Sequence, residues 1–558
     1  MWPPHQPSAL NRHRPFAHRE PISGIIGLTA LIQGAIGAGI TIGGTFISAG
    51  AIGGAIVGIA GSIALSAASA AMQRRQTASA LPGGYGVSTV DQGTRQAGSS
   101  PIPPQRLALG VVTTSFEKCF GRKKPPYIWI EGLLAAHRCG RLRAVIVNGR
   151  RVPLESANGG VVLSLEEGAT GILRPNTAPF YDGITRFIEV SYRDGRDYQA
   201  ICPIIARDFT NPAMPATFRQ QGHTTVTVKL HYGANDAAHK ALYGSDGQLN
   251  LLFEFEGAPY IDLRVPGCSI EDPESWVSGS NASLNIARYL YHQWSDARLL
   301  DPGQLNWDLL SKAADIDDLW RGVVNDDGTM GVERNHTVDC IVLSPEDPVQ
   351  KIRELLTACD GELIIDRGKY HVLPGHPYLP IGTLHQDMLA GGFDIQQETP
   401  DRDFVDTIMT EFIAPDRDYK PAVGPVLKWP RLATIDGQPL ETTLSLIATR
   451  GHARAQRLAR RKLIESRGGD GTGSERVSFS AVWSRAARRY KAGDVVRLYL
   501  RDFPKWNGVY QIKKRARGPD GTIVLDMLSF DKRRFAHHAP TDQQPFTINP
   551  AVLAAEAA

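Results

Sequence analysis

The chain lacks charge over one long stretch near its N-terminus. Asp, Glu, Lys and Arg make up 21% of its 558 residues, yet none of them lies between Pro21 and Gln73. About fifty uncharged residues could supply two membrane spans of about 20 residues each. The run is too long for the apolar core of a secretory signal, which spans about 7 to 15 residues. Arginines flank it on both sides, as a hairpin with both ends on the positive side of a bilayer would require: Arg12, Arg14, Arg19, Arg74 and Arg75.

The same run contains little Leu or Phe and is built from Gly, Ala and Ile. Small residues recur every fourth position, which places them on one face of a helix and allows close helix packing. This stripe comprises Gly50, Gly54, Gly58 and Ser62. We therefore expect residues 1–75 to form an apolar helical arm. It either packs against copies of itself in an assembly or meets a lipid bilayer at some stage, and a permanent anchor is the less favoured interpretation.

Motifs for catalysis and metal binding are also missing. The chain has no H-E-x-x-H, no Gly-rich loop ending in Lys-Ser/Thr and no G-x-S-x-G. Its six cysteines form no C-x-x-C pair, which argues against a zinc site and favours buried or free thiols in a reducing compartment. His371 and His376 flank a turn and are interpreted as surface residues, and two acidic runs at 314–318 and 325–328 lack the spacing of a calcium loop. We expect no enzyme activity, no metal and no cofactor.

The net charge of +4 is too balanced over 558 residues to favour nucleic acid by itself. One local exception is a predicted long helix over 448–467. Its arginines recur at spacings that place them on one continuous face: Arg450, Arg454, Arg457 and Arg461. By itself this face indicates a solvated or inter-subunit ion-pairing surface.

Turn residues and changes of periodicity divide the rest of the chain. Residues 76–106 are rich in Gly, Ser, Pro and Gln and read as a linker. Residues 107–271 read as a β-rich domain, with a hairpin turn at Asn148-Gly149 and an alternating strand at 224–231. Residues 272–400 read as a mixed α/β domain, in which one helix follows a Ser280/Asn281 cap.

A second helix in this mixed domain is expected to start with Ser344 as N-cap and Pro345 at the first helical position. A hairpin follows, with Asp366 to Gly368 as its turn. Residues 401–532 contain the basic helix and then a small β-barrel over about 476–532, whose turns are Asn507-Gly508 and 519–521. Residues 533–558 form a polar tail.

The order of these pieces resembles the central tail-tip hub proteins of long-tailed bacteriophages, the lambda-type host-specificity protein J group. The resemblance covers roughly residues 104–532. The segment Glu274–Asp318 is the most specific match, because Asn281-Ala282 stands where the family has Asn-Pro-Ala and Trp307 begins a similar second helix. "PPYIWIEGLLAAHRCGRLRAVIVNGRRVPL" is similar to an earlier family segment, and "ARAQRLARRKL" followed by "YKAGDVVRLYL" to its late helix and closing barrel. Many members carry receptor recognition in segments that follow the closing barrel, so the resemblance over residues 104–532 does not imply receptor recognition for this chain.

The resemblance implies a structural protein of the virion at the distal end of the tail. It implies an α+β, β-rich multidomain fold with two tube-like β-barrel hub domains, a mixed α/β insertion and the apolar N-terminal helical arm. A homotrimer would form a hub in the baseplate and contact the distal tail protein ring, the tape-measure protein, and tip or fibre proteins. DNA would pass through its lumen without sequence-specific binding during genome ejection, and the arm would contact the host membrane transiently. For the basic face at Arg450, Arg454, Arg457 and Arg461, the resemblance adds a second interpretation, in which the face borders this lumen.

Two other function classes are left open by the residues. The apolar run favours a membrane-anchored or pore-forming secreted protein with a β-rich ectodomain. A tail-associated cell-wall hydrolase has no positive signal in the sequence.

Overall fold

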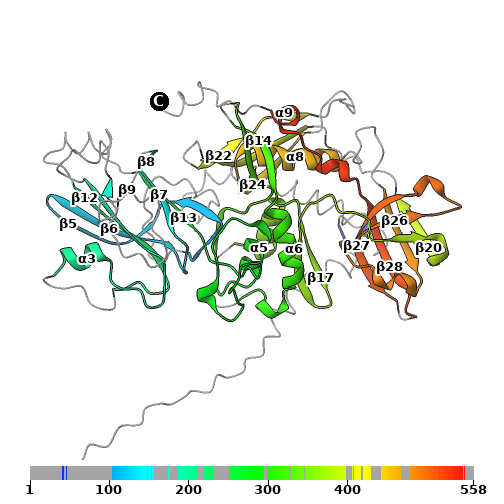
Figure 1. The fold of residues 1–558 in the computed structure, drawn as a ribbon, viewed down its shortest axis with the longest axis horizontal. Helices are drawn as coiled ribbons and strands as arrows, with labels where there is room; N and C mark the ends of the chain where they lie inside the picture. The colour runs from blue at the N-terminus through cyan, green and yellow to red at the C-terminus, as the bar shows by residue number, and fades with distance from the viewer. Residues whose placement is uncertain are drawn as a thin grey trace, which may run out of the picture. The chain divides into compact units, whose positions relative to one another are not determined.

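A computed structural model gives the fold (Figure 1). It describes residues 104–546 apart from gaps, and only Thr41, Ile42, Thr45 and Phe46 of the preceding part. The longer gaps are 156–173, 176–186, 211–217, 232–249, 397–404, 429–440 and 467–476. The described chain is β-rich with several separate sheets, which confirms the predicted fold class. Among these residues no helix is long and apolar enough to cross a membrane.

The predicted helical arm lies outside the described residues except at two short strands. β1 (Thr41–Ile42) pairs antiparallel with β2 (Thr45–Phe46), so these four residues are extended where a helix was expected. The small-residue stripe at Gly50, Gly54, Gly58 and Ser62 is outside the described residues.

The first β-rich unit consists of two four-stranded sheets that share one core. One sheet has the order β11-β12-β6-β5 and the other β4-β13-β7-β8. Val226 and Val228 of the first sheet lie in the same buried cluster as Phe253 and Phe255 of the second, so the two sheets face each other. The strands are β4 (Val111–Thr114), β5 (Glu117–Lys124), β6 (Tyr127–Ala135), β7 (Leu142–Val147), β8 (Arg150–Val152), β11 (Ile188–Arg193), β12 (Thr224–His231) and β13 (Leu251–Glu256). The pairing of β7 with β8 confirms the predicted hairpin.

Smaller elements complete this unit. They are the pair β9 (Leu154–Glu155) and β10 (Arg174–Pro175) and the helix α3 (Pro203–Asp208). β3 (Arg106–Leu109) leaves the unit and pairs with β16 (Cys340–Leu343), so two segments more than 200 residues apart form one ladder.

The middle of the chain is mixed, as predicted. Its helices are α5 (Ala282–Leu290), α6 (Trp307–Asp317) and α7 (Pro348–Thr357), and its hairpins are β14 (Trp320–Val324) with β15 (Met330–Arg334) and β17 (Glu362–Asp366) with β18 (Lys369–Leu373). Asn281 caps α5 as expected, since its side-chain oxygen accepts a hydrogen bond from Leu284 N. Arg367 and Gly368 both have positive φ, the conformation that a tight hairpin turn requires.

The predicted start of α7 is wrong by three residues. Its N-cap is Asp347, whose side chain accepts from Val349 N, and the first helical residue is Pro348. Ser344 N still donates to Gln105 O, which continues the ladder between β16 and β3. Because Ser344 N is used in that ladder, the helix begins only at the next Asp-Pro pair.

The basic helix is shorter than predicted at its start. β24 (Glu441–Arg450) pairs parallel with β21 (Thr407–Ala414), and α8 (His452–Ser466) begins after Gly451, whose φ is +88°. Arg450 is therefore the last residue of a strand and does not share the helical face. The other strands of this sheet are β22 (Lys420–Val423) and β23 (Leu427–Lys428).

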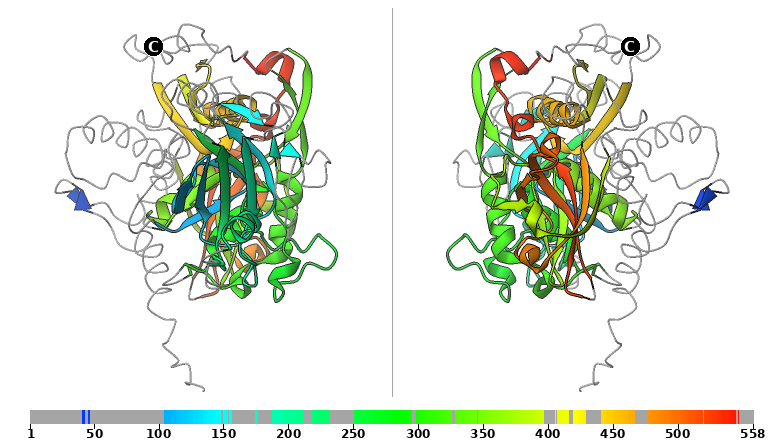
Figure 2. Two further views of the ribbon diagram at one scale, coloured as in Figure 1. Left: turned by 90° about the vertical axis from the view of Figure 1, so that its left-hand side faces the viewer. Right: turned by 90° about the vertical axis from the view of Figure 1, so that its right-hand side faces the viewer.

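The closing unit is one curled six-stranded sheet of order β19-β26-β27-β28-β25-β20. Its edge strands β19 and β20 are separated in sequence only by the 3-10 turn η4 (Gln386–Met388), so the sheet must curl to bring its edges together. Its strands are β19 (Thr383–His385), β20 (Leu389–Gln396), β25 (Ser478–Trp483), β26 (Val495–Tyr499), β27 (Gly508–Arg517) and β28 (Ile523–Ser529), and the orange ones face the viewer on the right of Figure 2. The predicted barrel covers about 476–532, so it does not include β19 and β20, which lie earlier in the chain.

Short helices connect or follow these strands: η2 (Pro273–Ser275), η3 (Pro302–Gln304), η7 (Arg485–Arg489), η8 (Pro504–Trp506), η9 (Lys532–Phe535) and α9 (Ala539–Asp542).

Gly110 joins β3 to β4 and supplies a test of this fold. Its φ is +74°, and a Cβ there would lie 1.9 Å from Val338 O. We expect Gly110→Ala to lower the free energy of unfolding by roughly 2 to 5 kcal/mol. The alanine would have to adopt a left-handed backbone conformation, and its Cβ would overpack the space next to Val338 O. Denaturant unfolding measures the change. Gly303→Ala, where nothing lies within 4 Å, is the control, and equal effects of the two changes would contradict the prediction.

Candidate functional site

Three of the four arginines predicted as a basic face lie in the interior of the chain. Arg454, Arg457 and Arg461 are only 6%, 2% and 2% exposed. Both carboxylate oxygens of Glu333 on β15 are engaged, Oε1 by Arg457 Nη1 at 2.8 Å and Oε2 by Arg454 Nη2 at 3.3 Å. Their ion-pair partner thus belongs to the same chain, and the three side chains are buried within it. Helical spacing correctly placed them together, but it did not predict what covers them.

Arg450 has a different neighbourhood. Its guanidinium lies 4.8 Å from the centre of the Tyr419 ring, and Nη2 donates to Thr113 Oγ1 at 3.4 Å. The Tyr419 hydroxyl bonds to Glu254, which also accepts from Arg151 at 2.8 Å. Arg450 therefore helps to join β24 to the first β-rich unit.

A buried histidine and aspartate complete the arginine cluster. Arg461 Nη1 lies 2.8 Å from His336 Nε2, and His336 Nδ1 lies 2.8 Å from Asp317 Oδ1. Because a guanidinium can only donate, Nε2 is the acceptor and the imidazole carries its proton on Nδ1, which donates to the carboxylate. Ser283 N at the start of α5 donates to the other oxygen of Asp317 at 2.7 Å.

Burial sets the protonation of these groups. Burial, aided by the nearby arginines, lowers the pKa of His336 well below its ordinary value, so the ring is neutral at physiological pH. Burial raises the pKa of Asp317 to about 7 and lowers that of Arg461 to about 9. His336 and Asp317 are both 0% exposed. A histidine–aspartate pair without solvent access cannot reach a substrate, so we assign it a structural role.

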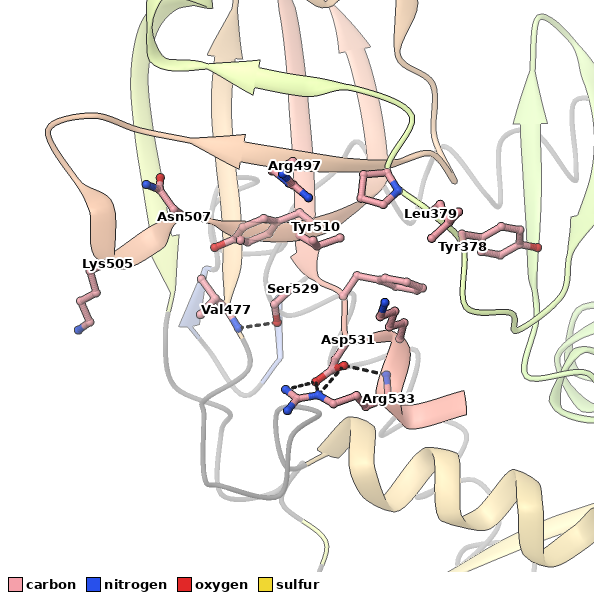
Figure 3. A pocket seen from close by; sticks show the side chains of 15 residues that line it. Tyr378, Leu379, Val477, Arg497, Lys505, Asn507, Tyr510, Ser529, Asp531 and Arg533 are labelled. Carbon is pink, nitrogen blue, oxygen red and sulfur yellow. Dashed lines mark hydrogen bonds and ion pairs between the residues drawn. The ribbon is translucent and has the colours of Figure 1, made fainter. Parts of the chain in front are cut away.

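A second feature lies on the closing unit, where a cleft of about 590 Å³ opens on the outer side of its sheet (Figure 3). Arg497 of β26 projects into it beside Tyr510 of β27, and Asp531 and Arg533 face each other on the opposite wall. The other lining residues are Tyr378, Leu379, Pro380, Val477, Lys505, Asn507, Gly508, Val509, Ser529, Phe530 and Lys532. Asp531 is the single acidic residue of this lining, and both of its oxygens accept from Arg533 Nε, at 2.8 and 3.1 Å.

Local sequence signals predicted neither this cleft nor the partners of the arginines. They predicted the Asn507-Gly508 turn but not the wall formed by 378–380, which lies more than 120 residues earlier in the chain. A usable signal was present in the alternation of basic and aromatic residues over 497–505.

Other candidate sites do not come together. Within the described part of the chain, no group of three or more His, Cys, Asp or Glu could hold a metal ion. All six cysteines are free thiols. The acidic run at 314–318 ends α6, and the run at 325–328 falls between the paired strands β14 and β15.

Comparison with known proteins gives weak likenesses only. No protein-family model matches the chain, and no curated protein sequence matches it. A chain from the virion of a native gene transfer agent particle is 17% identical with a TM-score of 0.48, over 91% of this chain and 98% of that one. The 43 kDa tail protein of prophage MuSo2 from Shewanella oneidensis is 11% identical with a TM-score of 0.25, over 76% of this chain and 100% of its own.

A third similar structure is the prophage tail protein gp18 from Listeria monocytogenes EGD-e. It is 11% identical with a TM-score of 0.22, over 38% of this chain and 59% of that one. At these values the likenesses do not establish a family.

The Glu333 ion pairs give a stability prediction. Glu333→Gln removes the charge that compensates Arg454 and Arg457. We expect the free energy of unfolding to fall by roughly 2 to 4 kcal/mol. The loss is smaller than the largest losses for fully buried ion pairs because the Glu333 side chain is 19% exposed. Glu274→Gln, which removes a surface partner of Arg138, is the matched control and should cost less than about 1 kcal/mol. If both variants unfold at the denaturant concentration of the wild type, the network does not stabilise the fold.

Asp317 gives a pH prediction. Its pKa of about 7 lies above the value near 3.9 of an unfolded aspartate, so between these values the folded state holds a proton that the unfolded state lacks. The free energy of unfolding therefore falls as pH rises through this window. Asp317→Asn removes this dependence, and the advantage of the wild type over the variant should shrink between pH 5 and pH 7.

Denaturant unfolding of both proteins at pH 5, 6 and 7 measures this difference. His336 is present in both and cancels in the comparison. A difference that stays constant with pH would show that Asp317 is ionised throughout.

Proposed function

We propose that this chain is a structural hub protein of a bacteriophage tail tip, without enzyme activity. In this proposal three copies form a ring that closes the distal end of the tail tube, anchors tip or fibre proteins and takes part in genome delivery. The observation that carries it is the presence of two β-rich units in one chain, a pair of facing four-stranded sheets and a curled six-stranded sheet, on either side of a mixed segment. Three chains would present six such units to a hexameric tube.

Contacts along the chain support this reading, because a ring needs its units held at a fixed spacing. The closing unit is tied to the mixed segment by Lys491 Nζ and Asp366 at 2.7 Å and by Arg534 and Asp360 at 3.5 Å. The first unit is tied to the β21–β24 sheet through the Tyr419 hydroxyl, Glu254 and Arg450. The order of segments that resembles the J-type hubs points the same way.

The remaining parts of the proposal concern partners. The distal tail protein ring and the tape-measure protein would contact the hub, and DNA would pass without sequence-specific binding. The uncharged run Pro21–Gln73 would be hidden among three copies at rest and contact the host membrane after the tip opens. A membrane-anchored or pore-forming secreted protein is the alternative that this run favours.

Mass measurement in solution tests the proposal. We expect the full chain, mixed with its tube partner, to sediment as a trimer and to leave peptidoglycan intact. A variant lacking residues 21–73 should still form the trimer, since the hub lies in residues 104–532. A folded monomer that degrades peptidoglycan would contradict the hub role, and a variant that loses both trimer and solubility would favour the arm as part of the core.

A further inference from the structure

One hairpin of the closing unit alternates basic and aromatic side chains. The sequence from β26 to the 3-10 turn η8 contains Arg497, Tyr499, Arg501, Phe503 and Lys505 at every second position. Leu498 and Leu500, which lie between the first of these, are 1% and 0% exposed. Arg497 and Tyr499 therefore share the outer face of β26, since side chains alternate across a strand. Tyr499 is 50% and Phe503 43% exposed.

Positive charge is concentrated around this hairpin. Residues 485–534 contain fourteen lysines and arginines against five aspartates and no glutamate, a net charge of +9. Residues 272–400 contain nine basic against twenty-one acidic residues, a net charge of −12. The chain total of +4 hides this segregation. A local excess of one sign attracts a ligand of the opposite sign.

The cleft extends the same surface. Arg497, Lys505 and Lys532 line it, and the carboxylate of Asp531 is already engaged by Arg533 (Figure 3). Asn507 Oδ1 accepts from Leu500 N at 2.6 Å, which fixes the orientation of this side chain at the cleft. The cleft thus presents cationic groups, and it shares Arg497 with the face of β26 that carries Tyr499.

We propose that this hairpin and cleft bind single-stranded nucleic acid. Arg497, Lys505 and Lys532 contact phosphates, and Tyr499 and Phe503 stack on bases, the combination by which proteins hold single strands without reading sequence. Stacking on these rings needs unpaired bases, so a duplex binds less well. His385 meets the Tyr499 ring edge-on at 5.9 Å and helps to fix its orientation. This activity goes beyond the hub role and does not depend on it.

Fluorescence anisotropy of a labelled 20-residue oligo(dT) with the full chain tests the proposal. Three phosphate contacts predict a slope of about −2 in a plot of log affinity against log salt. Arg497→Gln and Lys532→Gln should each make that slope less steep by about 0.7. Tyr499→Ala should weaken binding about 10-fold, and Tyr499→Phe, which keeps the ring, should bind within about 2-fold of the wild type.

Matched controls separate the site from charge alone. Lys514 and Arg517 are exposed cations on β27 outside the cleft lining, so changing each to Gln removes the same charge and should leave the slope nearly unchanged. The proposal is overturned if these controls act like Arg497→Gln, or if Tyr499→Ala binds like the wild type. It is also overturned if duplex DNA, or heparin as a probe for acidic glycans, binds more tightly than oligo(dT) in a Tyr499-dependent way.

Discussion

The buried arginines of α8 are the constraint on which the middle of this structure depends. Guanidinium groups taken out of water lose several kcal/mol of solvation each, and they stay buried only where charges and hydrogen bonds compensate them. Arg454 and Arg457 form ion pairs with Glu333. Arg461 donates a hydrogen bond to His336, which in turn donates one to Asp317. These partners come from α6, from β15 and from the loop that follows β15, so the burial of the α8 arginines depends on contacts with the mixed segment.

The same network excludes a catalytic reading of the His336–Asp317 pair. The geometry of the pair is that of an acid–base dyad, with the imidazole proton on Nδ1 and a carboxylate beside it. The surroundings of the pair do not suit acid–base catalysis. Both residues are fully buried, and His336 Nε2 accepts a hydrogen bond from the Arg461 guanidinium. The imidazole therefore acts as a fixed neutral connector between Arg461 and Asp317.

The second theme is the distribution of charge between the units. The acidic mixed segment and the basic closing unit attract each other, and the pairs Asp366–Lys491 and Asp360–Arg534 use part of that attraction within the chain. Arg497, Lys505 and Lys532 line the cleft on the closing unit. The closing unit thus carries exposed cations, whereas Arg454, Arg457 and Arg461 of α8 are buried.

The sequence by itself determined the local elements. The alternation of apolar and polar residues predicted β12, and the tight-turn residues predicted the β7–β8 and β17–β18 hairpins. Asn281 predicted the start of α5. Each of these signals acts within a few residues of the chain. Helical spacing placed Arg454, Arg457 and Arg461 on one face. It did not show that Glu333 and His336, more than 120 residues away, would cover that face.

Tertiary structure alone decided the burial of those arginines, the entry of β19 and β20 into the closing sheet, the late start of α7 and the wall of the cleft. The physical reason is common to all four. Periodicity records which side chains share a face, whereas burial and ladder pairing depend on segments far apart in the chain that meet only when it folds.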